Sequence, residues 1–316
     1  MPVLYSFLAA ILPMFTYLLI IWRMDKYDRE PLSFVLLHFG WGAFGAILLG
    51  VIGNFMLSDL TGIKDEGSGA LIQTVVFAPV AEEIAKGVFL LFTINSKKFD
   101  NITDGLVYGG AVGLGFGMTE NFTYFISYGT NAYNWFFLVI IRTAFSAVMH
   151  CISTATFGAF LGMAKFSLSK IRFLFPAAGL LIAIFYHFMW NISVSYENTY
   201  FYGFLFMIFL ILLFFALFKY ATVQEKKIIV SELVQESALD TLPKEHIPII
   251  SSHLRFRKSW VDEAIRKTYF RAAIKLAFAR MQCRRTEGFY QQYYLSEVGR
   301  NRMIIKSLLN PETVDL

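Results

Sequence analysis

The sequence predicts an all-α membrane protein, a bundle of about seven transmembrane helices followed by a helical cytoplasmic C-terminal region. The mean hydropathy is +0.54, and 56% of the 316 residues are apolar, with 34 phenylalanines among them. The apolar residues fall into stretches of about 20, the length that crosses a bilayer core of ~30 Å. The predicted spans cover approximately residues 3–22, 33–57, 70–95, 102–126, 135–164, 173–195 and 199–220.

The connections between these spans differ in their basic residues. The first connection contains Arg23, Lys26 and Arg29, and the third and fifth are also basic, whereas the second contains only Lys64 and the fourth and sixth contain none. Cytoplasmic loops of membrane proteins carry the basic excess. We therefore expect a multi-pass protein with its N-terminus outside and its C-terminus in the cytoplasm. The presence of only two cysteines and the plain arrangement of spans favour a bacterial inner membrane, with an organelle membrane as the alternative.

The charge of the chain divides it into a membrane core, residues 1–220, and a basic tail, residues 221–316. The core contains 12 basic and 12 acidic residues, and the tail contains 16 and 11. Within the tail, residues 258–285 repeat apolar positions at intervals of three and four, which predicts a helix. The tail is expected to lie beside the anionic inner leaflet, and no nucleic-acid partner is expected.

The third predicted span carries three ionisable residues within five positions, Glu82, Glu83 and Lys86. A charge near the bilayer centre costs at least ~2.5–3.5 kcal/mol, so such residues usually have a function. Glu82 and Lys86 are four residues apart and are expected to lie on one helix face. Glu83 is rotated by about 100° and is expected to face elsewhere. Pro79 predicts a kink just before Glu82.

The fourth span contains glycines at 105, 109, 113 and 117. Their four-residue spacing predicts a stripe at which another helix approaches closely, so this feature indicates packing. Glu120 lies slightly further along nearly the same face.

Three later spans contribute further polar residues, Glu120, His150, His187 and Asn191. At ~1.5 Å of helix per residue, Glu82, Glu120 and the two histidines all fall between mid-membrane and the outer third. We therefore expect them to converge on one hydrated site. Each could instead be structural when taken alone, and Arg142 could be an interfacial anchor.

Together the motifs resemble those of a known family. E-E-x-x-K at 82–86, F-x-x-x-E at 116–120, His150 and H-x-x-x-N at 187–191 are similar to the four motifs of the PrsW intramembrane proteases. That family is related to the type II CAAX prenyl endopeptidases and Abi proteins, in which the second motif ends in His rather than in Glu120. The resemblance implies a protease core, residues 1–220, that cleaves membrane-embedded proteins, as in anti-sigma-factor processing.

Two mechanisms are compatible with these residues. In a metal-free mechanism, Glu82 or Glu83 takes a proton from water, and Lys86 holds the first carboxylate in place. Glu120 shares or orients the water, and His187 and Asn191 donate hydrogen bonds to the oxyanion. In the alternative, a divalent metal such as zinc is bound by two histidines and a carboxylate, here His150, His187 and Glu83.

Two other classes of function also fit ionisable residues within spans. A proton- or cation-coupled transporter places such residues at mid-depth, although seven spans without an inverted repeat would be unusual. A non-catalytic scaffold would act through the tail. The substrate, the cytoplasmic partner of the tail and the oligomeric state are not identified by these residues.

Overall fold

A computed structural model describes residues 3–310, so residues 311–316 of the predicted tail lie outside the described residues. Between residues 3 and 310 the chain forms helices and no strands, which confirms the predicted all-α class. The chain divides into two compact units. The first comprises Met1–Asp25, Arg29–Lys165 and Ser169–Phe218, and the second comprises Lys26–Asp28, Phe166–Leu168 and Lys219–Leu316.

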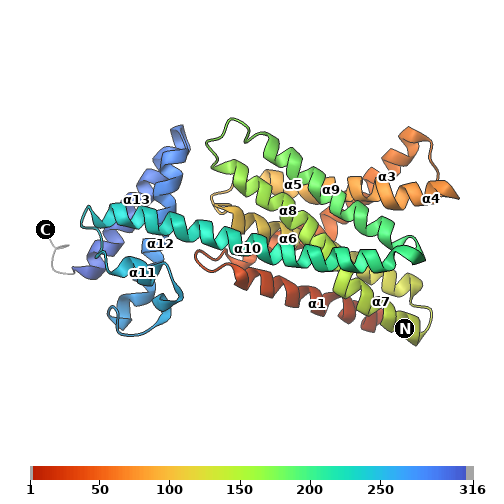
Figure 1. Ribbon diagram of the computed structural model, residues 1–316, viewed down its shortest axis with the longest axis horizontal. Helices are drawn as coiled ribbons and strands as arrows, with labels where there is room; N and C mark the ends of the chain where they lie inside the picture. The colour runs from red at the N-terminus through yellow and green to blue at the C-terminus, as the bar shows by residue number, and fades with distance from the viewer. Residues whose placement is uncertain (1–2, 311–316) are drawn as a thin grey trace. The chain divides into compact units, whose positions relative to one another are not determined.

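The helices of the first unit pack against one another (Figure 1). In chain order they are α1 (Val3–Met24), α2 (Leu32–Gly40), α3 (Ile47–Thr61), α4 (Ser68–Ile72), α5 (Ala78–Thr93), α6 (Ile102–Tyr128), α7 (Ala132–Ile141), α8 (Ala147–Lys165), α9 (Leu174–Val194) and the first part of α10 (Tyr200–Ser237). Three π-helical turns join α2 to α3, α4 to α5 and α7 to α8, at Trp41–Ala46, Gln73–Phe77 and Arg142–Ser146.

Five helical segments within residues 3–310 are long and apolar enough to cross a membrane, so the predicted count of seven is not confirmed. These segments are Val3–Met24, Leu32–Thr61, Ala132–Lys165, Leu174–Val194 and Glu197–Ser237. The helices that carry Glu82 and Glu120 are not among them. The charged and glycine residues of these two helices lower their mean hydropathy, although both are continuous helices in the structure.

The distortion predicted before Glu82 takes the form of a π-helical turn. The amide of Ala78 donates to the carbonyl of Gln73, five residues earlier. The next residue, Pro79, has no N–H group to donate. The carbonyl of Thr74, five residues before Pro79, therefore loses the donor that would continue the π pattern. Such turns occur frequently at functional sites.

The glycine stripe of α6 packs against α8, as predicted. A Cβ atom built at Gly105 would overlap the carbonyl of Gly158, and one at Gly113 would overlap the carbonyl of His150. A Cβ at Gly117 would lie 3.0 Å from the Cα of Ala147. The two backbones thus approach each other closely, and this contact sets the position of His150.

We expect Gly113→Ala to destabilise the protein, because a Cβ there would also lie 2.8 Å from the Cα of Cys151. Overpacking of this kind typically costs ~1–3 kcal/mol. Gly40→Ala is the matched control, since no atom lies within 4 Å of a Cβ at Gly40 and alanine favours helix. Thermal unfolding in detergent should show a lower midpoint for Gly113→Ala alone. Equal midpoints for the two variants would contradict the packing role.

The second unit has its own buried core and contains α11 (His246–Ile250), α12 (Glu263–Arg285), α13 (Gly288–Leu309) and the last part of α10. The fully buried apolar side chains of this core include Ile229, Leu233, Tyr269, Leu276 and Ile305. This confirms the helical C-terminal region.

Two buried carboxylates on α10, Glu232 and Glu236, form ion pairs with arginines of α12 and α13 in this unit. Arg302 binds Glu236 through two nitrogens, at 2.8 and 2.6 Å. The segment 26–28 also belongs to this unit, in which the Tyr27 hydroxyl donates to the carbonyl of Ser251 at 2.7 Å.

Candidate active site

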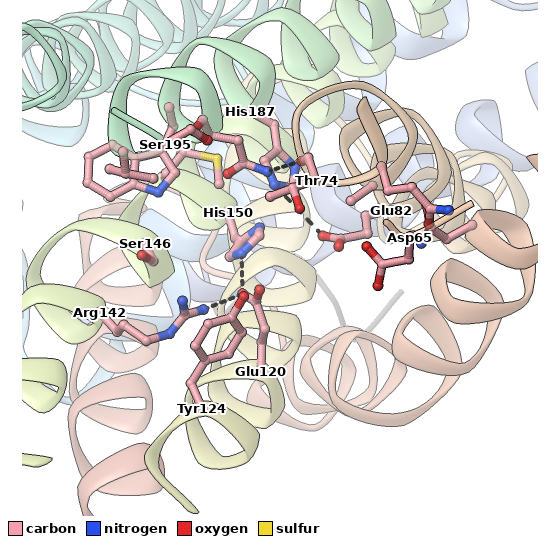
Figure 2. A pocket seen from close by; sticks show the side chains of 17 residues that line it. Asp65, Thr74, Glu82, Glu120, Tyr124, Arg142, Ser146, His150, His187 and Ser195 are labelled. Atoms are coloured by element: carbon pink, nitrogen blue, oxygen red, sulfur yellow. Dashed lines mark hydrogen bonds and ion pairs between the residues drawn. The ribbon is translucent and has the colours of Figure 1, made fainter. Parts of the chain in front are cut away.

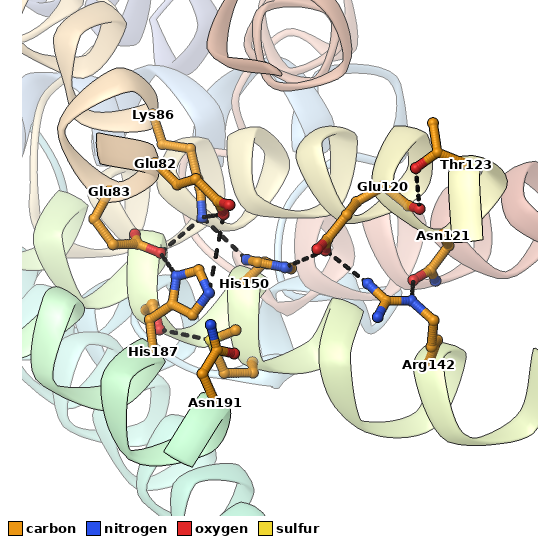
Figure 3. A network of polar contacts seen from close by, with 12 residues as sticks. Glu82, Glu83, Lys86, Glu120, Asn121, Thr123, Arg142, His150, His187 and Asn191 are labelled. Carbon is orange, nitrogen blue, oxygen red and sulfur yellow. Dashed lines mark hydrogen bonds and ion pairs between the residues drawn. The ribbon is translucent and has the colours of Figure 1, made fainter. Parts of the chain in front are cut away.

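Polar side chains from four helices meet inside the first unit (Figure 3). The structure thus brings together residues that are up to 105 positions apart, from Glu82 to His187. The contributing residues are Glu82, Glu83 and Lys86 on α5, Glu120 on α6, His150 on α8 and His187 on α9.

Lys86 lies at the centre of this network and is fully buried. Its Nζ is 2.7 Å from Oε1 of Glu83 and 3.0 Å from Nδ1 of His150, but 3.8 Å from Oε2 of Glu82. Lys86 therefore pairs mainly with Glu83, and the expectation that Glu83 faces elsewhere is wrong. Both carboxylates flank the lysine because residues three and four apart share a helix face.

Both carboxylate oxygens of Glu83 accept hydrogen bonds from protein groups. Besides Lys86, its Oε1 accepts a hydrogen bond from Nδ1 of His187 at 3.0 Å, and its Oε2 accepts one from Thr154 at 3.3 Å. An ionised carboxylate can only accept, so Nδ1 of His187 carries a proton. In neutral His187 the other ring nitrogen, Nε2, is then a free acceptor.

Glu82 differs from Glu83 in its surroundings. The Glu82 side chain is 17% exposed, against 1% for Glu83. Its Oε2 is buried and has no hydrogen-bond partner among the described residues, and it faces Nε2 of His187 at 3.9 Å. Glu82 is thus the carboxylate of this pair that is available to a bound molecule.

Glu120 links α6 to two cationic or imidazole groups. Its Oε2 is 2.7 Å from Nε2 of His150 and 2.8 Å from Nη2 of Arg142. The Arg142 guanidinium also donates to Oδ1 of Asn121 at 3.1 Å and stacks on the ring of Tyr124 at 3.5 Å. Arg142 could have been an interfacial anchor from its place in the sequence, whereas the structure places it within the site.

Asn191 lies at the edge of the site. Its Nδ2 donates to the carbonyl of Thr74 at 2.8 Å, which is the carbonyl left without a π-pattern donor before Pro79. This bond connects α9 to the π turn that precedes Glu82. The amide nitrogen predicted to bind an oxyanion is thus engaged with the backbone.

A central cavity of about 410 Å³ opens beside these groups (Figure 2). Figure 2 shows His150 in the middle of the lining, with Glu120 and Arg142 on one side of it and His187 on another. Glu83 and Lys86 are not part of the lining. Among the charged or imidazole groups, those that line this cavity are Asp65, Glu82, Glu120, Arg142, His150 and His187.

The lining contains a set of groups that fits a metal ion. Glu82, His150 and His187 each offer one ligand atom, and these atoms lie within 4.8 Å of one another. Two histidines and a carboxylate with an open position form a catalytic zinc set. Glu83, which the sequence analysis placed in the metal set, instead orients His187, as partners of metal-binding histidines do. His150 would exchange one of its two hydrogen bonds for the metal.

We expect Arg142→Met to lower the rate of the peptide cleavage that the sequence motifs imply by about 10–100-fold, the range found when partners of site residues are removed. The substitution leaves Glu120 with His150 alone and frees it to move. Rates measured on a membrane-embedded peptide would test this. Arg172→Met on the exposed surface is the matched control, and equal rates in both variants would contradict a role for Arg142.

Residues 30–218 match the family model described as PrsW family intramembrane metalloprotease. The chain is 28% identical over 207 residues to Protease PrsW of Bacillus subtilis, covering 64% of this chain and 88% of the relative. It is 29% identical over 164 residues to Protease PrsW of Geobacillus kaustophilus, covering 52% of this chain and 68% of the relative. No solved structure matches the chain.

Proposed function

The chain belongs to the PrsW family of intramembrane metalloproteases and is a multi-pass membrane protease. From this premise we propose that it hydrolyses peptide bonds of transmembrane proteins in the central cavity. The family predicted from the four motifs is thereby confirmed. The observation that carries the proposal is the convergence of Glu82, Glu120, His150 and His187 on one cavity.

Glu82 is the proposed catalytic carboxylate. Its side chain is 17% exposed and lines the cavity, so it can accept a proton from water as the water oxygen attacks the scissile carbonyl carbon. General bases contribute typically ~10²–10⁴-fold to rate. Glu83 is a positioning residue, because it holds both Lys86 and His187.

The residues that would bind a metal are Glu82, His150 and His187. Such an ion lowers the pKa of bound water and polarises a carbonyl oxygen. With Glu82 bound to the ion, Glu120, which lines the same cavity, would be the carboxylate that takes the proton from water in its place. Arg142 and His150 contact Glu120 through its Oε2, and Lys86 pairs with Glu83.

The orientation and the physiological substrate are also part of the proposal. The second unit contains segments 26–28 and 166–168 together with the tail, and both segments come from connections that are rich in basic residues. This supports a cytoplasmic location for the tail from residue 221 and an N-terminus outside. An anti-sigma factor with a single transmembrane helix is the proposed class of substrate.

The direct test uses the purified full-length protein in liposomes with a labelled single-pass transmembrane protein. We expect cleavage within the transmembrane segment, loss of cleavage after dialysis against a metal chelator, and recovery on addition of zinc. Mass spectrometry of the fragments locates the cleaved bond. Absence of cleavage under all conditions, or proton-driven solute uptake in its place, would contradict the proposal.

A further inference from the structure

We propose that two apolar pockets extend the central cavity, one beginning at Glu82 and the other at Ser146. Each pocket binds a large apolar side chain of the substrate, one on either side of the scissile bond. This inference rests on the proposed function and specifies its substrate: a locally unwound transmembrane segment with bulky apolar residues on both sides of the cleaved peptide bond.

The first apolar pocket, of about 280 Å³, lies between α3, α5 and α6. It shares Asn54, Ala78, Glu82 and Glu120 with the central cavity, so the two spaces meet at the catalytic carboxylate. The walls away from this junction are mainly apolar, and they include Ile47, Val51, Phe55 and Phe116.

The second apolar pocket, of about 380 Å³, is formed by α6, α7, α9, α10 and the π turn before α8. Arg142 and Ser146 are among the residues that it shares with the central cavity. In Figure 2, Ser146 and Glu82 lie on opposite sides of His150. The outer walls of this pocket are Leu138, Ile141, Phe145, Tyr200 and Phe204.

A polar group lies at each junction. Asn54, between the central cavity and the first pocket, donates through Nδ2 to Gln73 at 3.3 Å. This bond fixes the amide, and the buried Oδ1 has no partner among residues 3–310. At the other junction, Ser146 is a buried residue that lines both the central cavity and the second pocket, and its hydroxyl can donate and accept hydrogen bonds.

These features match an extended peptide more closely than a helix or a lipid chain. A transmembrane helix satisfies its own N–H and C=O groups, and an unwound stretch must find other partners because unpaired groups cost several kcal/mol in a membrane. Asn54 and Ser146 can supply such partners on either side of the reacting bond. The apolar walls then receive the side chains that such segments contain.

The test reduces each pocket separately with a bulky residue. Val51→Trp fills the first pocket, and Leu138→Trp fills the second. The matched controls are Leu48→Trp on α3 and Ile140→Trp on α7, both exposed residues outside the pocket linings. The probe is a pool of synthetic single-pass transmembrane peptides in detergent, with central positions randomised among Ala, Leu and Phe, and mass spectrometry locates each cut.

We expect the unmodified protein and both controls to prefer Leu or Phe on both sides of the cut. Each pocket-filling variant should shift the preference toward Ala on one side only, and the two variants on different sides. The ratio of kcat/KM for the peptide with Leu to that for the peptide with Ala should fall at least ~10-fold in each pocket-filling variant. This is the low end of the selectivity that one methylene group gives in an apolar pocket. Unchanged preferences, or the same change in the controls, would overturn the pockets while leaving cleavage dependent on Glu82 intact. If no cleavage depends on Glu82, the proposed function itself is wrong.

A second measurement tests the junction residue Asn54. Peptides N-methylated at single backbone positions lack one N–H donor. We expect one such position to lower kcat/KM about 2–10-fold in the unmodified protein, the effect of one neutral hydrogen bond, and to have no further effect in Asn54→Leu. An equal loss in both proteins would contradict the assignment and indicate a merely structural residue.

Discussion

Glu82→Gln is expected to lower kcat for peptide cleavage at least ~100-fold, because it removes a general base whose usual contribution is ~10²–10⁴-fold. Glutamine has the same shape but neither accepts a proton under these conditions nor binds a metal as a carboxylate does. Glu82 has no hydrogen-bond partner for Oε2 within the described chain, so the substitution breaks no such bond there. Initial rates on a single-pass peptide in detergent provide the measurement.

Two controls separate catalysis from folding in this experiment. Thermal unfolding of Glu82→Gln should show a midpoint no lower than that of the unmodified protein. Glu197→Gln, at an exposed position between α9 and α10, should retain full activity. Retention of more than a tenth of the activity by a folded Glu82→Gln protein would remove Glu82 from the catalytic role.

Lys86→Met is expected to give the largest loss of stability. Lys86 is fully buried, and its Nζ lies 2.7 Å from Glu83. Removing one partner of a buried ion pair leaves the other charge uncompensated, which typically costs ~3–5 kcal/mol. Circular dichroism on heating the protein in detergent should show a clearly lower midpoint than for the unmodified protein.

The double variant Lys86→Met/Glu83→Gln distinguishes this cause from simple loss of packing. Removing both charges should recover much of the lost stability, because replacing a whole buried pair is often neutral. Activity should stay low, since His187 loses the carboxylate that orients it. If the loss of stability in the double variant equals the sum of the losses in the two single variants, charge pairing is not the reason for the loss in Lys86→Met.

Much of the site could be predicted from the sequence because burial of charge in a membrane is rare. Glu82, Glu120, His150 and His187 were expected at similar depth, and the structure places all four along one cavity. The glycine stripe likewise predicted close helix packing, since spacing alone determines the face on which these residues lie.

Other features depend on how neighbouring helices pack, and the spacing of residues along one helix does not predict that packing. Glu83 was expected to face away from Glu82 and Lys86, but it binds Lys86, and α8 and α9 pack on its side and supply Thr154 and His187 to it. The positions of Glu82 and Glu83 in the sequence determine the angle between their side chains on α5. They do not determine which of the two side chains lines the cavity.

Arg142 could have been found by the depth argument that identified Glu120, since both lie about six or seven positions from the outer ends of their predicted spans. The direction in which the Arg142 side chain points around its helix could not be predicted in this way. A π turn, Arg142–Ser146, separates it from His150, and such turns change the phase of the helix. For the same reason the engagement of Asn191 with Thr74 follows from the π turn before Pro79 and not from the H-x-x-x-N spacing.

The central claim is that groups from separate helices act as one catalytic unit, and a double-mutant cycle between α5 and α9 tests it most directly. Rates would be measured for Glu82→Gln, His187→Gln and the double variant on one transmembrane peptide. Residues that act together give strongly non-additive losses, so the double variant should be about as slow as the slower single variant. Losses that multiply, or a single variant with unimpaired activity, would contradict a shared site.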